Sequence, residues 1–546
     1  MLSYRKLAMR VLGRPLHTEG IDSPRPASQR AAALVLTAAM LTTLTAPAFA
    51  KEWYIEEGDI TVRAGETEGT NKVSQGTNTD VEDTDTIITN SDKNTASSNT
   101  VTIEAKDKDD KVEVTLKDVN IDASSRSEAA VSVTGEGNTN IELDGDNALK
   151  SDIYSSGISS SGSLTISGGE NDSLTAQGGS GADGIYSSGS LTISGGTVTA
   201  NGGSSGGGDG GDGIWSSGGV TISGGSTVTA NGGDGKDDYG GDGIRSSDVT
   251  ISGGSTVTAN GGNGGNVSGD GIRSDGGVTV SDGTVTAKGG NGDSKDGYGG
   301  DGIRSGGVVT ISGNTVNAAG GYGGKVGGYG ICSFDRVAIS GGTVEAAGGN
   351  GSTGGGSGIY SSVIDLSGSL ELTAKAGSPT GKALLQNGRE LDLDTIKDKL
   401  GPGAKVTTTD ANGKTKEVSS PLPVEPEKPV IPEESSSSSD DGSATPSAPA
   451  SPLPGLTVTD KDGQRISYTS TQSGNTLTVC VGRFTASFRI SLAALRQLRA
   501  EGIETITFQT ILCSTTLSVD ELLAMGGEDA EAVLTHRSTD SSLTVG

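Results

Sequence analysis

Apolar and polar residues alternate in short runs through the middle of the chain. In 191–193 and again in 197–200 every second residue is apolar, which is the period of a β-strand with one buried face. The residues predicted to point inward are Leu191, Ile193, Val198 and Ala200. The intervening threonines are predicted to point outward.

The same run of short strands recurs eight times. Its first strand carries an isoleucine at positions 158, 185, 214, 244, 272, 303, 331 and 359, in steps of 27 to 31 residues. A fixed period of this size predicts a solenoid. Three short strands and three corners per repeat predict an all-β parallel β-helix, with equivalent strands about 4.8 Å apart. Gly-Gly pairs follow the strands, and we expect them to supply the positive φ angles of the corners.

The segments around the repeats differ in composition. Residues 1–50 combine six Lys or Arg, the apolar run Ala31–Leu44 and the small-residue motif Ala48-Phe49-Ala50, which predicts a signal peptide and a secreted protein. No later stretch is apolar over the roughly 20 residues that a membrane span needs. The predicted domains are capping coils (51–130), repeats with a C-terminal cap (131–419), a Pro/Ser/Glu-rich linker (420–455) and a small α+β domain of unknown function (456–546).

The chain is strongly acidic, with a formal net charge of −28. Removing the signal peptide, with its six basic residues against Glu19 and Asp22, gives −28 − 4 = −32. A field of this sign disfavours nucleic acid and anionic membranes as partners. Because His536 is the only histidine beyond the signal peptide, a zinc site with several histidines is excluded, and a Ser-His-Asp triad would need that one residue.

The three cysteines follow no metal-binding spacing. Cys332 stands alone in the repeats and is expected to be a free thiol or an intermolecular partner. Cys480 and Cys513 lie in strand-like runs of the last domain, and both a disulfide and two free thiols remain open.

The position after each first-strand isoleucine is predicted to point outward. In successive repeats it holds Tyr186, Trp215, Arg245, Arg273, Arg304, Cys332 and Tyr360. Aromatic faces stack on sugar rings, and arginines bind carboxylates or hydroxyls in a fixed plane. We therefore interpret the column as a ligand-binding face, although exposed sheet positions also favour aromatic residues for structural reasons alone.

An aspartate lies two residues before the isoleucine in five consecutive repeats. These residues are Asp183, Asp212, Asp242, Asp270 and Asp301. Because stacked like charges repel, something must offset them, and calcium, turn amides and the arginine three residues later are the candidates. Acidic, glycine-rich loops suit calcium, which takes six to eight oxygens, so we predict calcium with these aspartates as ligands. Asx turns without a metal are the alternative.

Three stretches of sequence together resemble a known group of proteins. They are WYIEEGDITV at 53–62, NIELDGD at 140–146, and the repeated GI…TISGG…TVTA units. The chain resembles secreted, carbohydrate-binding domain-containing β-helix proteins of anaerobic, gut-type Firmicutes over roughly residues 51 to 380. The resemblance implies a right-handed parallel β-helix related in shape to polysaccharide lyases, with bound calcium and affinity for plant cell-wall polysaccharides. Tyr329 and Ser357 interrupt the aspartate series in the last two repeats.

Three functions compete on this basis. The first is a non-catalytic protein that binds a plant or microbial polysaccharide along the Tyr/Trp/Arg column. The second is an adhesin or matrix scaffold, docked at the cell surface through its C-terminal domain. The third is a calcium-dependent polysaccharide lyase with an arginine such as Arg273 as base. Because no repeat departs from the others to build a unique site, we expect no enzymatic activity.

Overall fold

The fold is taken from a computed structural model. It describes residues 50–292 and 294–420, and, further along, 455–459, 465–466, 468–473, 475–481, 486–510, 514–525, 530–536 and 541–545. The chain divides into two compact units, Met1–Pro423 and Val424–Gly546. The predicted signal peptide, apart from Ala50, and nearly all of the predicted linker lie outside the described residues. Within the described residues, no helix is both long enough and apolar enough to cross a membrane.

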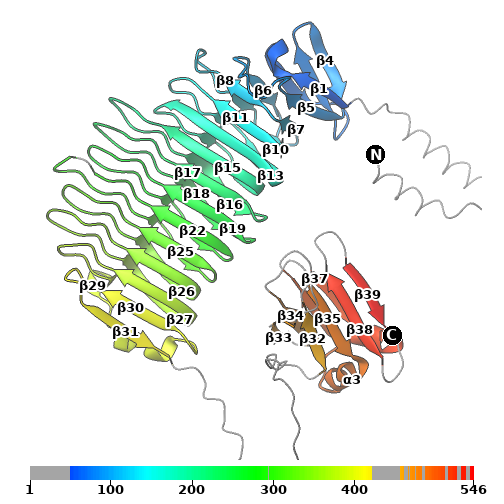
Figure 1. The fold of residues 1–546 in the computed structure, drawn as a ribbon, viewed down its shortest axis with the longest axis vertical. Helices are drawn as coiled ribbons and strands as arrows, with labels where there is room; N and C mark the ends of the chain where they lie inside the picture. The colour runs from blue at the N-terminus through cyan, green and yellow to red at the C-terminus, as the bar shows by residue number, and fades with distance from the viewer. Residues whose placement is uncertain are drawn as a thin grey trace, which may run out of the picture. The chain divides into compact units, whose positions relative to one another are not determined.

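The first unit is a parallel β-solenoid of about 13 turns, which confirms the predicted fold class. Figure 1 shows its strands stacked side by side from β1 to β31. The strands that carry the repeated isoleucines, with two earlier ones, form one parallel column, in which Ile158, Ile185 and Ile214 are direct neighbours. This first column is β6 (Val101–Glu104), β9 (Val131–Thr134), β12 (Ile158–Ser160), β14 (Ile185–Ser187), β16 (Ile214–Ser223), β18 (Ile244–Ile251), β20 (Ile272–Ser274), β23 (Ile303–Ser305), β26 (Ile331–Ala347) and β27 (Ile359–Lys375).

Two further columns complete each coil. The second contains β7 (Lys111–Lys117), β10 (Asn138–Asp144), β13 (Ser163–Ser180), β15 (Leu191–Gly203), β21 (Val278–Val280) and β24 (Val309–Ile311), joined by the later parts of β16, β18, β26 and β27. The third contains β8 (Asn120–Asp122), β11 (Asp146–Lys150), β17 (Thr227–Asn231), β19 (Ser255–Asn260), β22 (Gly283–Lys288), β25 (Thr315–Ala319) and β30 (Lys405–Thr409), with the ends of β13, β15, β26 and β27.

Both ends of the stack are closed by antiparallel strands. At the N-terminal end β2 (Ile60–Ala64), β3 (Asn71–Gln75) and β4 (Asn78–Asp83) form a meander beside β1 (Ala50–Tyr54), η1 (Ile55–Glu57) and β5 (Asp85–Thr89). At the other end lie β28 (Leu384–Gln386), β29 (Arg389–Glu390), η2 (Leu393–Thr395), η3 (Lys397–Lys399) and β31 (Thr415–Ser419). Such caps cover sheet edges that would otherwise pair with other chains.

The interior follows the predicted two-residue period. Leu191, Ile193, Val198 and Ala200 are all fully buried, as are the eight repeated isoleucines. The sequence pattern did not single out the serine two residues after each isoleucine, which is also buried. In seven of the eight repeats its hydroxyl donates to a corner carbonyl of the preceding coil, as from Ser216 Oγ to Gly189 O at 2.8 Å, and Ser160 donates to Gly162 O of its own coil. Each buried serine therefore has its hydrogen bond within the stack.

The glycine pairs act in two different ways, and only one of them matches the prediction. Pairs after the second strand, such as Gly195 and Gly196, have positive φ. Pairs after the third strand do not, and there the backbones of neighbouring segments approach too closely for a side chain. A Cβ on Gly262 would lie 2.0 Å from the carbonyl oxygen of Gly233, and in the loop before a first strand a Cβ on Gly241 would lie 1.9 Å from that of Gly211. The prediction of positive φ was therefore wrong for these pairs, which are glycine because of packing rather than conformation.

In its described residues the second unit has two four-stranded sheets and two helices. One sheet is formed by β32 (Leu456–Thr459), β35 (Ala486–Ser491), β38 (Glu531–His536) and β39 (Ser541–Val545). The other is formed by β33 (Thr469–Ser473), β34 (Thr476–Cys480), β36 (Thr505–Gln509) and β37 (Ser514–Ser518). Helix α3 (Leu492–Ala500) is capped by Ser491, whose side chain accepts from Ala494 N, and α4 is Val519–Met525.

The close approach of the glycine backbones gives a direct test. Replacing Gly241 by alanine should destabilise the solenoid by at least ~2 kcal/mol, because the added methyl overlaps the Gly211 carbonyl and the coils must separate. Gly206→Ala is the matched control, since a Cβ there meets no atom within 4 Å. The measurement is denaturant unfolding followed by far-ultraviolet circular dichroism. Equal midpoints for the two variants would contradict the packing role.

Candidate functional site

The five repeated aspartates form one continuous hydrogen-bonded ladder. The Oδ1 atom of each accepts the backbone N–H of the equivalent residue in the next coil, at 2.5 to 2.7 Å. Tyr329 N–H closes the series by donating to Asp301 Oδ1 at 2.6 Å. As whole residues, Asp212, Asp242, Asp270 and Asp301 are only 4–6% exposed. The aspartates thus lie beneath the surface rather than projecting from the loops.

Burial controls the electrostatics of this ladder. It raises the pKa of Asp183 and of Asp301 to about 6, and raises the pKa values of Asp212 and Asp270 well above the usual range. Neighbouring carboxylates raise the pKa of Asp212 and Asp270 further, while hydrogen bonds from backbone N–H groups and the nearby arginines oppose the rise. The ladder therefore holds protons at a higher pH than surface aspartates do.

The predicted Tyr/Trp/Arg column lies directly beside the ladder. Tyr186, Trp215, Arg245, Arg273 and Arg304 are neighbours in register on β14, β16, β18, β20 and β23. Tyr360 lies two coils beyond Arg304, after Cys332. These side chains are half-buried, with the exception of Cys332.

Two arginines of the column approach aspartates of the ladder. Arg304 Nη1 lies 3.3 Å from Asp301 Oδ2, and its Nε lies 4.0 Å from Asp270 Oδ2. The Arg245 Nη1 atom lies 4.0 Å from Asp212 Oδ2. Arg273, between them in the column, forms no ion pair with the described residues.

The prediction that Cys332 faces outward on an exposed column was wrong, because its side chain is only 1% exposed. Asp301 and Arg304 on the preceding coil lie close enough to act on its thiol electrostatically. Burial raises the pKa of the Cys332 thiol far above its ordinary value. Cys332 is therefore a buried, unreactive thiol of the column and not a reactive or intermolecular one.

Aromatic rings occupy both ends of the column. Tyr186 and Trp215 meet edge to face with centroids 5.2 Å apart, and the Arg245 guanidinium lies 5.1 Å from the Trp215 centroid. At the other end, Tyr329 and Tyr360 stack at 5.2 Å. These contacts hold the rings in fixed positions while leaving part of their surface accessible.

A second wall, which the sequence reasoning missed, is formed by the loops that precede the first strands. Tyr239, Val267, Tyr298 and Val326 stack on one another through backbone bridges. Tyr239 and Tyr298 are 51% and 41% exposed. The two nearly identical loops at 233–242 and 292–301 were the available signal, since each places a tyrosine three residues before the ladder aspartate.

A groove runs between the two walls. One cavity of about 290 Å³ is lined by residues of the ladder, the column and the loop wall, among them Asp212, Trp215, Tyr239 and Arg273. A second cavity of about 550 Å³ contains Tyr154 and Tyr186, and it shares Gly181, Asp183 and Trp215 with the first. We call this continuous depression the corner groove.

Aromatic residues concentrate in this part of each coil. Residues 51–420 contain eleven aromatic side chains, and all but Trp53 and Tyr54 lie from nine residues before to three residues after a repeated isoleucine. The nine are Tyr154, Tyr186, Trp215, Tyr239, Tyr298, Tyr322, Tyr329, Phe334 and Tyr360. A preference of aromatic residues for strands does not account for this restriction, because it would place them on all three columns and several of the nine lie in loops.

The ladder by itself does not fit the predicted calcium ion. Calcium needs six to eight oxygens, but each ladder aspartate has committed Oδ1 to a backbone N–H, and arginines face Oδ2 of Asp212, Asp270 and Asp301. No group of three or more His, Cys, Asp or Glu side chains within the described residues is arranged to hold a metal. Calcium remains a prediction for which a further source of oxygen ligands is needed.

The C-terminal unit offers no comparable arrangement among its described residues. His536 is buried, burial lowers its pKa, and its Nε2 lies 3.0 Å from Thr515 Oγ1. This contact contains no carboxylate, so the described residues do not form a Ser-His-Asp triad around His536. Cys480 is a free thiol, and its proposed partner Cys513 lies outside the described residues.

Comparison with known proteins adds no assignment, because no family model, curated protein or solved structure matches the chain.

The buried ladder predicts how stability depends on pH. Because the pKa values of its aspartates are raised on folding, their protonated forms favour the folded state, and this contribution is full below about pH 4 and is lost as pH rises through 6 and above. The solenoid should therefore unfold at lower denaturant concentration at pH 8 than at pH 5. Asp270→Asn keeps an oxygen for the Asp301 N–H but cannot ionise, so it should raise stability at pH 8 and weaken the pH dependence.

Asp237→Asn is the control for this measurement, since Asp237 is an exposed loop residue with the same change in charge. Unfolding curves at pH 5, 6.5 and 8 would compare the three proteins. An Asp270→Asn protein with the same pH dependence as the unsubstituted chain would contradict the assignment.

Proposed function

We propose that this protein binds an extended polysaccharide along the corner groove without transforming it chemically. The observation that carries the proposal is the gathering of nine aromatic residues in one region of seven of the eight repeats, where four of them, Tyr154, Tyr186, Trp215 and Tyr239, line the corner groove. A β-solenoid with such a surface is consistent with polysaccharide-binding proteins. The proposal also rests on the predicted export, which would bring the protein to its ligand.

The groove provides the contacts that a sugar chain requires. Rings such as Trp215 and Tyr239 offer apolar faces for stacking on sugar rings. Arginines and carboxyl groups offer hydrogen bonds to hydroxyl groups in fixed directions. From Tyr186 to Tyr360 the column covers six coil intervals, or ~29 Å at about 4.8 Å each, which suits a polymer better than a small molecule.

The charge of the groove bears on the kind of polysaccharide. The chain as a whole repels anions, but three arginines stand together on β18, β20 and β23. Arg273 lies near the buried Asp242, whose pKa it lowers, but it forms no ion pair within 4.0 Å among the described residues, so its guanidinium can also donate hydrogen bonds to a ligand. An acidic sugar would therefore be accommodated beside Arg245 and Arg273, and a neutral sugar beside the aromatic residues at the other end of the groove.

Affinity electrophoresis of the full chain tests this proposal. Gels would contain polygalacturonate, xylan, a soluble cellulose derivative or no glycan, each with calcium and with chelator. Retardation is expected in at least one glycan, and Trp215→Ala or Tyr239→Ala should weaken it about tenfold, or ~1.4 kcal/mol. Tyr54→Ala is the control, because Tyr54 lies outside the groove in the N-terminal cap.

The other outcomes distinguish the alternatives. Unretarded migration in every gel would reject the polysaccharide proposal for this panel and favour an adhesin or scaffold that docks through its C-terminal unit. Cleavage products in the same gels would favour a lyase. Loss of retardation with chelator would support the predicted calcium.

A further inference from the structure

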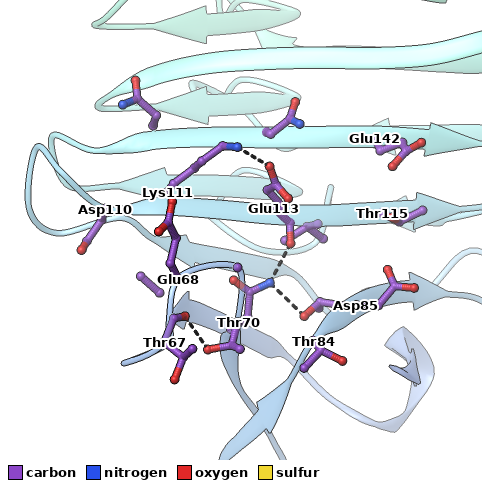
Figure 2. A pocket seen from close by; sticks show the side chains of 18 of the residues that line it. Thr67, Glu68, Thr70, Thr84, Asp85, Asp110, Lys111, Glu113, Thr115 and Glu142 are labelled. Atoms are coloured by element: carbon purple, nitrogen blue, oxygen red, sulfur yellow. Dashed lines mark hydrogen bonds and ion pairs between the residues drawn. The ribbon is translucent and has the colours of Figure 1, made fainter. Parts of the chain in front are cut away.

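A second, larger cavity lies at the N-terminal end of the solenoid. It measures about 820 Å³ and lies between the turn that joins β2 to β3 and the outward face of β7, β10 and β13. We call it the N-terminal groove. Figure 2 shows Lys111, Glu113, Thr115 and Glu142 on the strands and Thr67, Glu68 and Thr70 on the turn. It shares no lining residue with the corner groove.

Buried hydrogen bonds fix the turn in place over the strands. Asn71 is 6% exposed, and its Nδ2 donates to Thr86 Oγ1 at 2.9 Å and to the Glu113 carbonyl at 2.6 Å. Within the turn, Gly65 N–H donates to the Thr70 carbonyl at 2.8 Å. The groove is therefore preformed, and a ligand would not have to order its wall.

An unused hydrogen-bond acceptor lies in the floor of this groove. Glu113, Asn140 and Thr165 are cross-strand neighbours on β7, β10 and β13. The Oδ1 atom of Asn140 is buried and has no hydrogen-bond partner. A buried acceptor without a donor is unfavourable, and rotation of the amide by a bound donor would relieve it.

The lining supplies mainly acceptors and negative charge. Hydroxyl groups come from Thr67, Thr70, Thr84, Thr86, Thr115 and Thr165. The carboxylates of Glu68, Asp85 and Glu142 form no ion pair with described residues. The two lysines are engaged, because Lys111 pairs with Glu113 at 2.6 Å and Lys108 pairs with Glu136, outside the groove, at 3.6 Å.

Aromatic residues and arginines are absent from the described lining of this groove. Ring stacking and anion binding, which characterise the corner groove, are therefore not available here. A complementary ligand must bring hydrogen-bond donors and positive charge, and it must be polar on all sides.

We propose that the N-terminal groove is a second binding site, for an oligosaccharide that carries protonated amino groups. Its ammonium groups would meet the unpaired carboxylates in charge-assisted hydrogen bonds. Its hydroxyl groups would pair with the threonine hydroxyls and with the Asn140 amide. The site is independent of the polysaccharide proposed for the corner groove.

Calorimetric titration of the full chain with a glucosamine oligomer tests the site. Binding is expected, and the fully N-acetylated oligomer of the same length should bind at least tenfold more weakly, because it lacks the charge. Absence of binding by the glucosamine oligomer, or equal affinity for the two, would overturn the proposal. Spermine, which has the charge without the sugar, should also bind at least tenfold more weakly, and equal affinity would overturn the assignment to an oligosaccharide.

Matched variants separate this site from general attraction to an acidic protein. Glu142→Gln should weaken binding about tenfold, whereas Glu345→Gln, with the same change in charge on an exposed position far along the solenoid, should not. Asn140→Ala should weaken binding, whereas Thr221→Ala, three coils along the same column, should not. Equal effects within either pair would overturn the proposal.

A last comparison keeps the two grooves distinct. Trp215→Ala should leave binding of the glucosamine oligomer unchanged, and Asn140→Ala should leave retardation by polysaccharide gels unchanged. Loss of the glucosamine oligomer in Trp215→Ala would instead place it in the corner groove and overturn the second site.

Discussion

The parallel register between coils is the constraint on which the rest of this structure depends. Each coil donates its backbone hydrogen bonds to the same positions of the next, so residues a repeat apart in sequence become direct neighbours. Register is kept through the loops as well as the strands, because glycine backbones there pack without room for a Cβ. Columns of equivalent side chains, and hence both walls of the corner groove, follow from this single arrangement.

The same register places identical side chains of successive coils beside one another, and their chemistry determines which hydrogen bonds they make. Asn201, Asn231 and Asn260 are neighbours in register at the ends of β15, β17 and β19, and the amide of each later residue donates to the one before it, as from Asn231 Nδ2 to Asn201 Oδ1 at 2.8 Å. Ionised carboxylates cannot donate, so the aspartates would only repel. They accept backbone N–H groups instead, and arginines lie over them from the neighbouring column. The aspartate ladder and the arginine column are thus parts of one electrostatic arrangement.

The sequence predicted the features that depend on local period and missed those that depend on how loops pack. Two-residue alternation identified buried positions such as Ile193 and Val198, and the 27–31-residue steps identified the solenoid. Alternation says nothing about loops, so the burial of Asp242 and the wall formed by Tyr239 could not be predicted from it. Cys332 was misplaced because neighbouring side chains on adjacent coils, rather than strand direction, determine its burial. The N-terminal groove depends on a turn packed against strands more than forty residues away, a contact that no local pattern records.

Differences between equivalent positions indicate which columns hold the fold and which meet a ligand. The position two residues before the isoleucine is aspartate in five consecutive coils, and in each it makes the same backbone hydrogen bond. The position after the isoleucine changes from tyrosine to tryptophan to arginine along the same coils, although its backbone environment is constant. The arginines have a structural role, because they lie over the aspartate ladder, whereas the aromatic rings at the two ends of the column form no ion pair with it. Under the proposed function, a polymer that differs in chemistry along its length would account for the aromatic ends of the column.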